Sequence, residues 1–169
     1  MKTALMVIAP SHFRDEEYAA PKQILEDHAV SVSTASIDPG ECIGKLGMHA
    51  IATISVADAA RIPFDAVVFV GGAGAAVFFD NPKAHALARQ QADAGRVLAA
   101  ICVAPSILAH AHLLDGVRAT AFPSREDDLR AFGAIWTGAP VTRDGQIITA
   151  NGPDSAREFG AAIVAALTT

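Results

Sequence analysis

Long hydrophobic runs, a surplus of basic residues and a cysteine framework are all missing from this sequence. No apolar stretch approaches the roughly 18 residues of a membrane span, and the run at 4–9 is too short for a signal-peptide core. With 13 Lys and Arg against 18 Asp and Glu, the net charge of −5 leaves no basic excess to neutralise nucleic-acid phosphates. Two cysteines, Cys42 and Cys102, favour a reducing compartment over a disulfide scaffold. We therefore expect a cytoplasmic protein with no membrane or nucleic-acid partner.

Intrinsic disorder is excluded by composition, because 51% of the residues are hydrophobic and only 18% are charged. The 169 residues contain no repeat, low-complexity tract or linker-like segment, so a single domain over 1–169 is expected. No group of His, Cys, Asp and Glu has the spacing of a metal site, and we expect neither a metal nor a cofactor.

Short apolar runs alternate with well-punctuated helical segments. The runs at 3–9, 66–70 and 97–101 predict strands buried on both faces of a parallel sheet, and the alternating segment 30–36 predicts a strand nearer its edge. Helices are predicted from Asn81 and Pro82 to Gly95, and after Pro153, where Ser155 and Glu158 have capping-box spacing. Asp144 and Gly145 predict a hairpin. The pattern indicates an α/β fold, a flavodoxin-like three-layer sandwich with a mostly parallel central sheet.

Three loops should meet at one edge of this sheet, since ligands bind beyond the carboxyl ends of parallel strands. They are residues 10–17, 71–74 and 102–105. Cys102 lies between an apolar strand and a helix expected over 103–112, which is the geometry of a nucleophile elbow. The N-terminus of that helix should favour the thiolate. The alternative is a small buried residue in an apolar patch.

Glu17 is the second candidate, because Pro21 deprives its carbonyl of a helical partner and makes the first helical turn irregular. A carboxyl beside a thiolate in a partly dry pocket should have a raised pKa and can shuttle protons. Asp15 and Glu16, in contrast, are interpreted as solvated acids at a helix start. An amide of the 71–74 turn, beside that of Val103, can form an oxyanion hole.

The histidines limit the chemistry. None of the six follows residue 112, and His110 lies eight residues beyond Cys102, too far along the expected helix to act as its base. Only His12 leaves the sheet at the expected edge, which makes it the candidate catalytic base, and a plain surface histidine is the alternative interpretation.

Five short motifs together resemble the PfpI superfamily, which includes PfpI-type intracellular peptidases and the Parkinson-disease-associated protein deglycase. They are AAICVAP at 99–105, DEEYAAP at 15–21, VGGAG at 70–74, ATAFPSREDD at 119–128 and ITANGP at 148–153. The resemblance implies a fold like that of class I glutamine amidotransferases and a homodimer or larger homo-oligomer. It assigns the nucleophile to Cys102, the family carboxyl to Glu17, and the oxyanion amides to Gly72 and Val103.

Both histidines usual in the family are absent, because Val103 and Phe122 occupy their positions. Peptide hydrolysis needs a base that can protonate an amine leaving group, so the leading hypothesis is an enzyme acting on small reactive carbonyls. In a reaction of glyoxalase III or deglycase type, the Cys102 thiolate would form a hemithioacetal. The alternatives are a redox-responsive stress protein that oxidises Cys102, and an intracellular cysteine peptidase or amidase.

Overall fold

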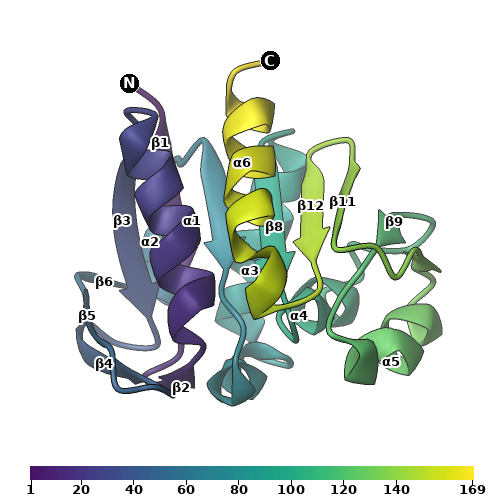
Figure 1. The fold of residues 1–169 in the computed structure, drawn as a ribbon, viewed down its shortest axis with the longest axis horizontal. Coiled ribbons are helices and arrows are strands. Elements are labelled where there is room, and N and C mark those ends of the chain that lie inside the picture. Colours follow the sequence, from purple (N-terminus) through teal and green to yellow (C-terminus); the bar gives the residue numbers. More distant parts are fainter.

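A seven-stranded sheet forms the middle layer of the molecule, and the computed structural model describes all of residues 1–169 (Figure 1). The strand order is β11-β12-β8-β7-β1-β3-β6. All neighbours are parallel except β11 and β12, which form an antiparallel hairpin. The strands are β1 (Thr3–Val7), β3 (Ser31–Ser36), β6 (Ile54–Ser55), β7 (Ala66–Phe69), β8 (Val97–Ile101), β11 (Val141–Asp144) and β12 (Ile147–Ala150).

Helices cover both faces of the sheet and complete a three-layer sandwich. Along β1, Ala4 and Met6 belong to a core beneath α1 and α6, whereas Leu5 and Val7 belong to a core shared with the remaining helices. Figure 1 shows α1 and α6 side by side in front of the sheet. The helices are α1 (Asp15–Asp27), α2 (Val56–Ala59), α3 (Pro82–Asp93), α4 (Pro105–His110), α5 (Glu126–Ala131) and α6 (Ala156–Leu167). None of them is both long enough and apolar enough to cross a membrane.

Two small sheets lie beyond the central one. The first joins β2 (Ser11–Phe13), β4 (Gly40–Gly44) and β5 (His49–Ala52), and the second pairs β9 (Arg118–Ala119) with β10 (Ile135–Trp136). Short 3-10 turns are found at Ala73–Phe78, Pro123–Arg125 and Pro153–Ser155. The first small sheet extends the carboxyl edge of the central sheet, at the lower side of Figure 1.

The predicted fold class is confirmed, and so are the buried strands and the punctuation of α3. The Asn81 side chain accepts hydrogen bonds from the N–H groups of Lys83 and Ala84, and Gly95 follows the helix with φ of +68°. The predicted capping role of Ser155 is wrong, because its hydroxyl donates instead to Asn151 Oδ1 at 2.6 Å.

The predicted helix over 103–112 is also wrong in its bounds, since α4 covers only Pro105–His110. Residues 102–104 form a turn, in which the Ala104 N–H donates to Ile101 O and the Ser106 N–H donates to Val103 O. Two residues, Val103 and Ala104, therefore lie between the elbow and the first residue of α4.

Candidate active site

The three predicted loops do meet, because β8, β7 and β1 are adjacent and parallel in the sheet. The chain leaves β1 through β2 toward α1, leaves β7 at Gly71, and leaves β8 at Cys102. Backbone hydrogen bonds join the loops: the Arg14 N–H donates to Gly71 O at 2.9 Å, and the Phe122 N–H donates to Cys102 O at 2.8 Å. The site is thus assembled from loops that are far apart in sequence.

Cys102 has the backbone of a nucleophile elbow. Its φ is +65°, a conformation that is uncommon for a residue other than glycine and costs on the order of 1 kcal/mol. Its N–H still donates to Ala150 O at 2.9 Å, so the residue is anchored to the end of β12. With 8% of its surface exposed, the thiol is reached only through the opening of the site. Such strain at a cleft is typical of a functional residue.

Glu17 lies in the first turn of α1 and is fully buried. Neither carboxyl oxygen has a hydrogen-bond partner, although the neighbouring Cys102 thiol and Gly71 N–H lower the pKa of the carboxyl. Gly71 separates the two side chains: a Cβ there would overlap Glu17 Oε1 and would lie 2.7 Å from Cys102 Cβ. The close approach of carboxyl and thiol therefore depends on the absence of a side chain at position 71.

The titration of this pair is governed by burial. Burial raises the pKa of Glu17 to about 7, as expected from the sequence. Burial and the neighbouring Glu17 carboxylate raise the pKa of Cys102 to about 12, against the lowering effect of the Gly72 and Val103 N–H groups. The sequence predicted a thiolate favoured by a helix N-terminus, whereas burial, the largest cause, holds the pKa of the thiol above its ordinary value. When Glu17 keeps its proton, the repulsion disappears and the carboxyl can donate to the sulfur.

The pair opens into a cavity of about 330 Å³. It is lined by all the candidate residues from the sequence, His12, Glu17, Gly72, Cys102 and Val103, and also by Arg14, Lys45, Phe122 and Ser124. The structure therefore brings the whole predicted set together, and it adds two cations that the sequence did not single out.

Gly72 and Val103 present the backbone amides of the site. Both N–H groups lower the pKa of the Cys102 thiol, which places them on the side of the sulfur where a bound oxygen can accept from them. Gly72 has φ of +97°, and a Cβ there would lie 2.8 Å from the Phe13 carbonyl carbon. Only glycine fits this turn, which is the reason why the amide can face the thiol.

His12 lies at the cavity and His110 lies away from it, as the sequence predicted. His12 lines the cavity but is exposed, and its Nδ1 lies 3.3 Å from Ser11 Oγ. His110 faces elsewhere, with Nδ1 at 2.7 Å from Asp80 Oδ1 and Nε2 at 2.9 Å from Asp128 Oδ2. Apart from His12, the titratable side chains at the cavity are Cys102, Glu17 and the two cations.

Asp15 was interpreted as a solvated acid, and this is wrong. It is 9% exposed, and its carboxylate accepts the N–H groups of Leu46 and Met48 at 3.0 and 2.9 Å. These residues belong to the turn between β4 and β5, which carries Lys45 to the cavity. The run of three acids at 15–17 contains no local signal that separates this buried residue from its solvated neighbour Glu16.

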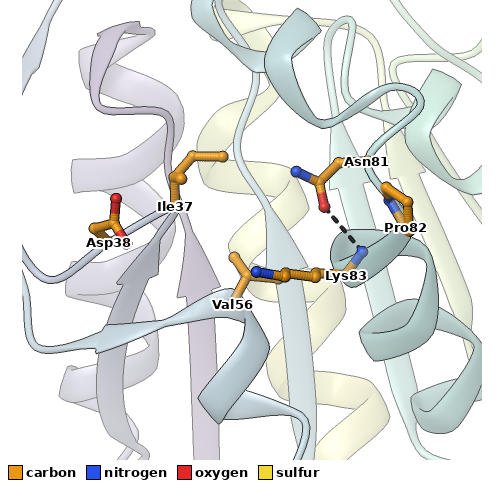
Figure 2. Close-up of a pocket in the computed structure, with 6 residues that line it drawn as sticks. All are labelled: Ile37, Asp38, Val56, Asn81, Pro82 and Lys83. Atoms are coloured by element: carbon orange, nitrogen blue, oxygen red, sulfur yellow. Dashed lines mark hydrogen bonds between the residues drawn. The ribbon is translucent and has the colours of Figure 1, made fainter.

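A second hollow of about 380 Å³ lies at the start of α3 (Figure 2). Asn81 already uses its side-chain oxygen there to cap the helix. The lining residues are Ile37, Asp38, Val56, Asn81, Pro82 and Lys83, and they include no Cys, Ser, Thr or His. No group of three or more His, Cys, Asp or Glu side chains in the molecule is arranged to hold a metal ion.

Comparisons with known proteins agree with this geometry. The model of the DJ-1/PfpI family matches residues 2–166. An uncharacterised protein of Methanocaldococcus jannaschii is 38% identical over 172 residues, covering 99% of this chain and 84% of the relative. A deglycase of Pyrococcus horikoshii is 30% identical, covering 88% of this chain and 90% of the relative.

Solved structures extend the likeness to the whole fold. A ThiJ/PfpI domain protein of Brachyspira murdochii superposes with a TM-score of 0.94 at 31% identity, covering 98% of this chain and 96% of the other. DJ-1beta of Drosophila melanogaster gives a TM-score of 0.88 at 28% identity, with coverages of 98% and 90%.

Proposed function

The chain belongs to the DJ-1/PfpI family, and from that premise we propose a cysteine-dependent enzyme that acts on small reactive carbonyl compounds. One observation carries the proposal: Cys102, on a positive-φ elbow, faces the buried carboxyl of Glu17 across Gly71 in an open cavity. Relatives named as deglycases, at about 30% identity, support a reaction of deglycase or glyoxalase III type.

In the first step the Cys102 thiol passes its proton to the Glu17 carboxylate, and the resulting thiolate adds to an aldehyde. The Cys102 sulfur forms a bond to the carbonyl carbon, and the C=O electron pair moves to the oxygen. The Gly72 and Val103 N–H groups stabilise this oxyanion, and the Glu17 carboxyl supplies a proton to give the hemithioacetal. A carboxyl with a pKa of about 7 is suited to both giving and taking protons near neutrality.

Glu17 can then complete the conversion of a 2-oxoaldehyde such as methylglyoxal. Its carboxylate removes the proton from the former aldehyde carbon and returns it to the adjacent carbon, while the hydroxyl proton passes to the ketone oxygen, which converts the hemithioacetal into a thioester. Water hydrolyses the thioester, releasing a 2-hydroxy acid and restoring the thiol. No amine leaves, so the chemistry does not need a histidine at position 103 or 122, where Val103 and Phe122 stand. A peptidase or amidase, the third hypothesis, would need such a histidine to protonate the leaving amine, and this chain has one at neither position.

Methylglyoxal consumption with enzymatic detection of D- and L-lactate tests the proposal. Cys102→Ala should show only the uncatalysed rate, and Glu17→Gln should lose roughly 10²- to 10⁴-fold while its Cys102 is still alkylated by iodoacetamide. Cys42→Ala is the matched control, because Cys42 is buried in the β4–β5 hairpin away from the cavity. Turnover by Cys102→Ala at the wild-type rate would refute the mechanism.

A second candidate function is oxidation of Cys102 in a redox-responsive stress protein. The unpartnered Glu17 carboxyl favours it, since a protonated carboxyl beside the sulfur can donate to a sulfenate or sulfinate oxygen. Mild peroxide followed by mass spectrometry should add oxygen at Cys102 before Cys42. Equal or reversed order would count against this function.

Homodimerisation is proposed from family membership alone. The β4–β5 hairpin exposes Ile43 and Ile51, at 45% and 60%, as side chains that a second copy can cover. Light scattering coupled to size exclusion measures the assembly directly.

A further inference from the structure

The cavity over Cys102 has a charge opposite to that of the whole chain. The protein carries 18 acidic against 13 basic residues, yet the cavity wall holds two cations, Arg14 and Lys45. Its one carboxyl, Glu17, is fully buried and has a pKa raised to about 7 by burial. A cleft lined by one sign of charge concentrates ligands of the other sign.

Lys45 is the uncompensated cation of this wall. Arg14 donates through Nε and Nη2 to the Glu16 carboxylate, at 3.1 and 2.8 Å, so its charge is already paired. Lys45 takes part in none of the ion pairs of the molecule. Its ammonium is therefore free to pair with a group that enters the cavity.

The backbone beneath Lys45 is held firmly in place. The Lys45 N–H donates to Phe13 O at 2.9 Å, and buried Asp15 accepts the next two free N–H groups of the turn, from Leu46 and Met48. Gly44 packs so closely that a Cβ would lie 2.6 Å from Asp15 Cγ. A buried carboxylate is costly unless it is hydrogen-bonded, and here its bonds fix this turn against the start of α1. Asp15 thus acts as a positioning residue for Lys45.

We infer that Lys45 determines specificity, and that the site selects small aldehydes carrying a carboxylate, with the carbonyl carbon at Cys102 and the carboxylate at Lys45. One free cation matches one negative charge, and a cavity of about 330 Å³ suits a small molecule. The inference rests on the proposed function for its carbonyl chemistry. With glyoxylate, the sulfur bonds to the aldehyde carbon, the C=O pair moves to oxygen, and Glu17 supplies the proton of a reversible hemithioacetal.

Alkylation with iodoacetate and iodoacetamide tests the charge preference without any turnover. The two reagents have nearly the same size, and in both the thiolate displaces iodide, but only iodoacetate is anionic. Intact-protein and peptide mass spectrometry give the two rates at Cys102. The iodoacetate-to-iodoacetamide ratio should exceed that of N-acetylcysteine in the wild type, and should fall roughly fivefold in Lys45→Gln, the effect of one unit charge across a partly solvated site.

Three further variants separate charge from shape. Lys45→Arg should restore the ratio, and Asp15→Asn should lower it because the amide holds the turn less firmly. Lys83→Gln, at the other hollow, is the matched control and should leave the ratio unchanged.

Glyoxylate should protect Cys102 from iodoacetamide several-fold better in wild type than in Lys45→Gln, and neutral glyoxal should protect both equally.

An unchanged alkylation ratio in Lys45→Gln would overturn the inference, whatever the turnover of methylglyoxal. Conversely, a ratio that follows the charge at position 45 while no aldehyde is consumed or protects Cys102 would sustain the anion preference and refute the carbonyl chemistry. The two failures are therefore distinct.

Discussion

His110→Gln should remove a stabilisation that depends on pH. Both ring nitrogens of His110 face carboxylates, Nδ1 at 2.7 Å from Asp80 and Nε2 at 2.9 Å from Asp128. A neutral imidazole donates through one nitrogen only, so the two bonds require the imidazolium. Asp128 also accepts from Arg125, whose Nε donates to Ser106 Oγ at 2.8 Å and whose guanidinium lies 4.8 Å from the Phe79 ring centroid.

The sign of the effect follows from the two pKa shifts. Burial lowers the pKa of His110, but the hydrogen bonds to Asp80 and Asp128 outweigh it, and the pKa lies above its ordinary value. This stabilisation is fully present below the unfolded-state pKa, about 6.5, and is lost as pH rises through the folded-state pKa. For Asp128, burial raises the pKa, but the neighbouring Ser106, His110 and Arg125 side chains lower it by more, so the pKa lies below its ordinary value. Its contribution is present above about pH 4 and is lost at lower pH.

The size of the pH-dependent stabilisation is set by the more buried of the two hydrogen bonds of His110, the one to Asp128. The side chains of His110 and Asp128 are 16% and 23% exposed, and a hydrogen bond between charged groups contributes about 1.5–3 kcal/mol. Asp80 is 83% exposed and adds little. Discounted for partial solvation, the wild-type advantage over His110→Gln should shrink by about 1–2 kcal/mol between pH 6 and pH 9. For a domain of this size that corresponds to roughly 2–8 °C in Tm.

Thermal unfolding followed by circular dichroism between pH 5 and pH 9 measures this difference. His28→Gln is the control, because His28 is exposed and its Nδ1 contacts only the Ile24 carbonyl. The pH dependence of His110→Gln is judged against this variant, in which the substituted histidine faces no carboxylate. A gap between wild type and His110→Gln that stays constant from pH 6 to pH 9 would show that the charge of the imidazolium does not contribute.

Two further substitutions test packing and capping. Gly71→Ala should lower the free energy of unfolding by about 1–3 kcal/mol through overpacking and should slow iodoacetamide alkylation of Cys102. Gly95→Ala is the control, because nothing lies within 4 Å of a Cβ there. It should cost about 1 kcal/mol in backbone strain and leave the alkylation rate unchanged. Equal alkylation rates in the two variants would contradict the packing at the site. Asn81→Ala should lower the unfolding free energy in urea by about 1 kcal/mol through loss of the cap, with no change at Cys102; an unchanged midpoint would show that the cap does not stabilise α3.

The elbow could be predicted from sequence because its signals are local. The run at 97–101 is buried on both faces, Cys102 follows it directly, and Pro105 marks the start of a helix. The same locality explains the confirmed cap at Asn81. The topology rule for parallel sheets then placed the loops after β1, β7 and β8 at one edge.

Two features of the site could not be predicted because they depend on distant contacts. The strands β4 and β5 are short and contain Gly, Cys and His, so they lack a strong periodic signal. Their position is fixed by pairing with β2 and by Asp15, more than 30 residues away in sequence. Without that contact, Lys45 had no visible relation to the nucleophile. The prediction of a lowered thiol pKa failed for a similar reason, because the burial that raises this pKa arises only when the site is packed.

Gly71 lies between the nucleophile and the carboxyl of the site. The nucleophile follows β8, the carboxyl is on α1 beyond β1, and the strand between them, β7, contributes a residue without a side chain. The contact between Cys102 and Glu17 is therefore set by strand order, and a change in any one of the three loops changes both groups. Because the positions of the usual family histidines hold Val103 and Phe122, and His12 is exposed, the proton that leaves the thiol has one buried acceptor, Glu17. The proposed mechanism therefore assigns the proton transfers at the sulfur and at the substrate to this one carboxyl.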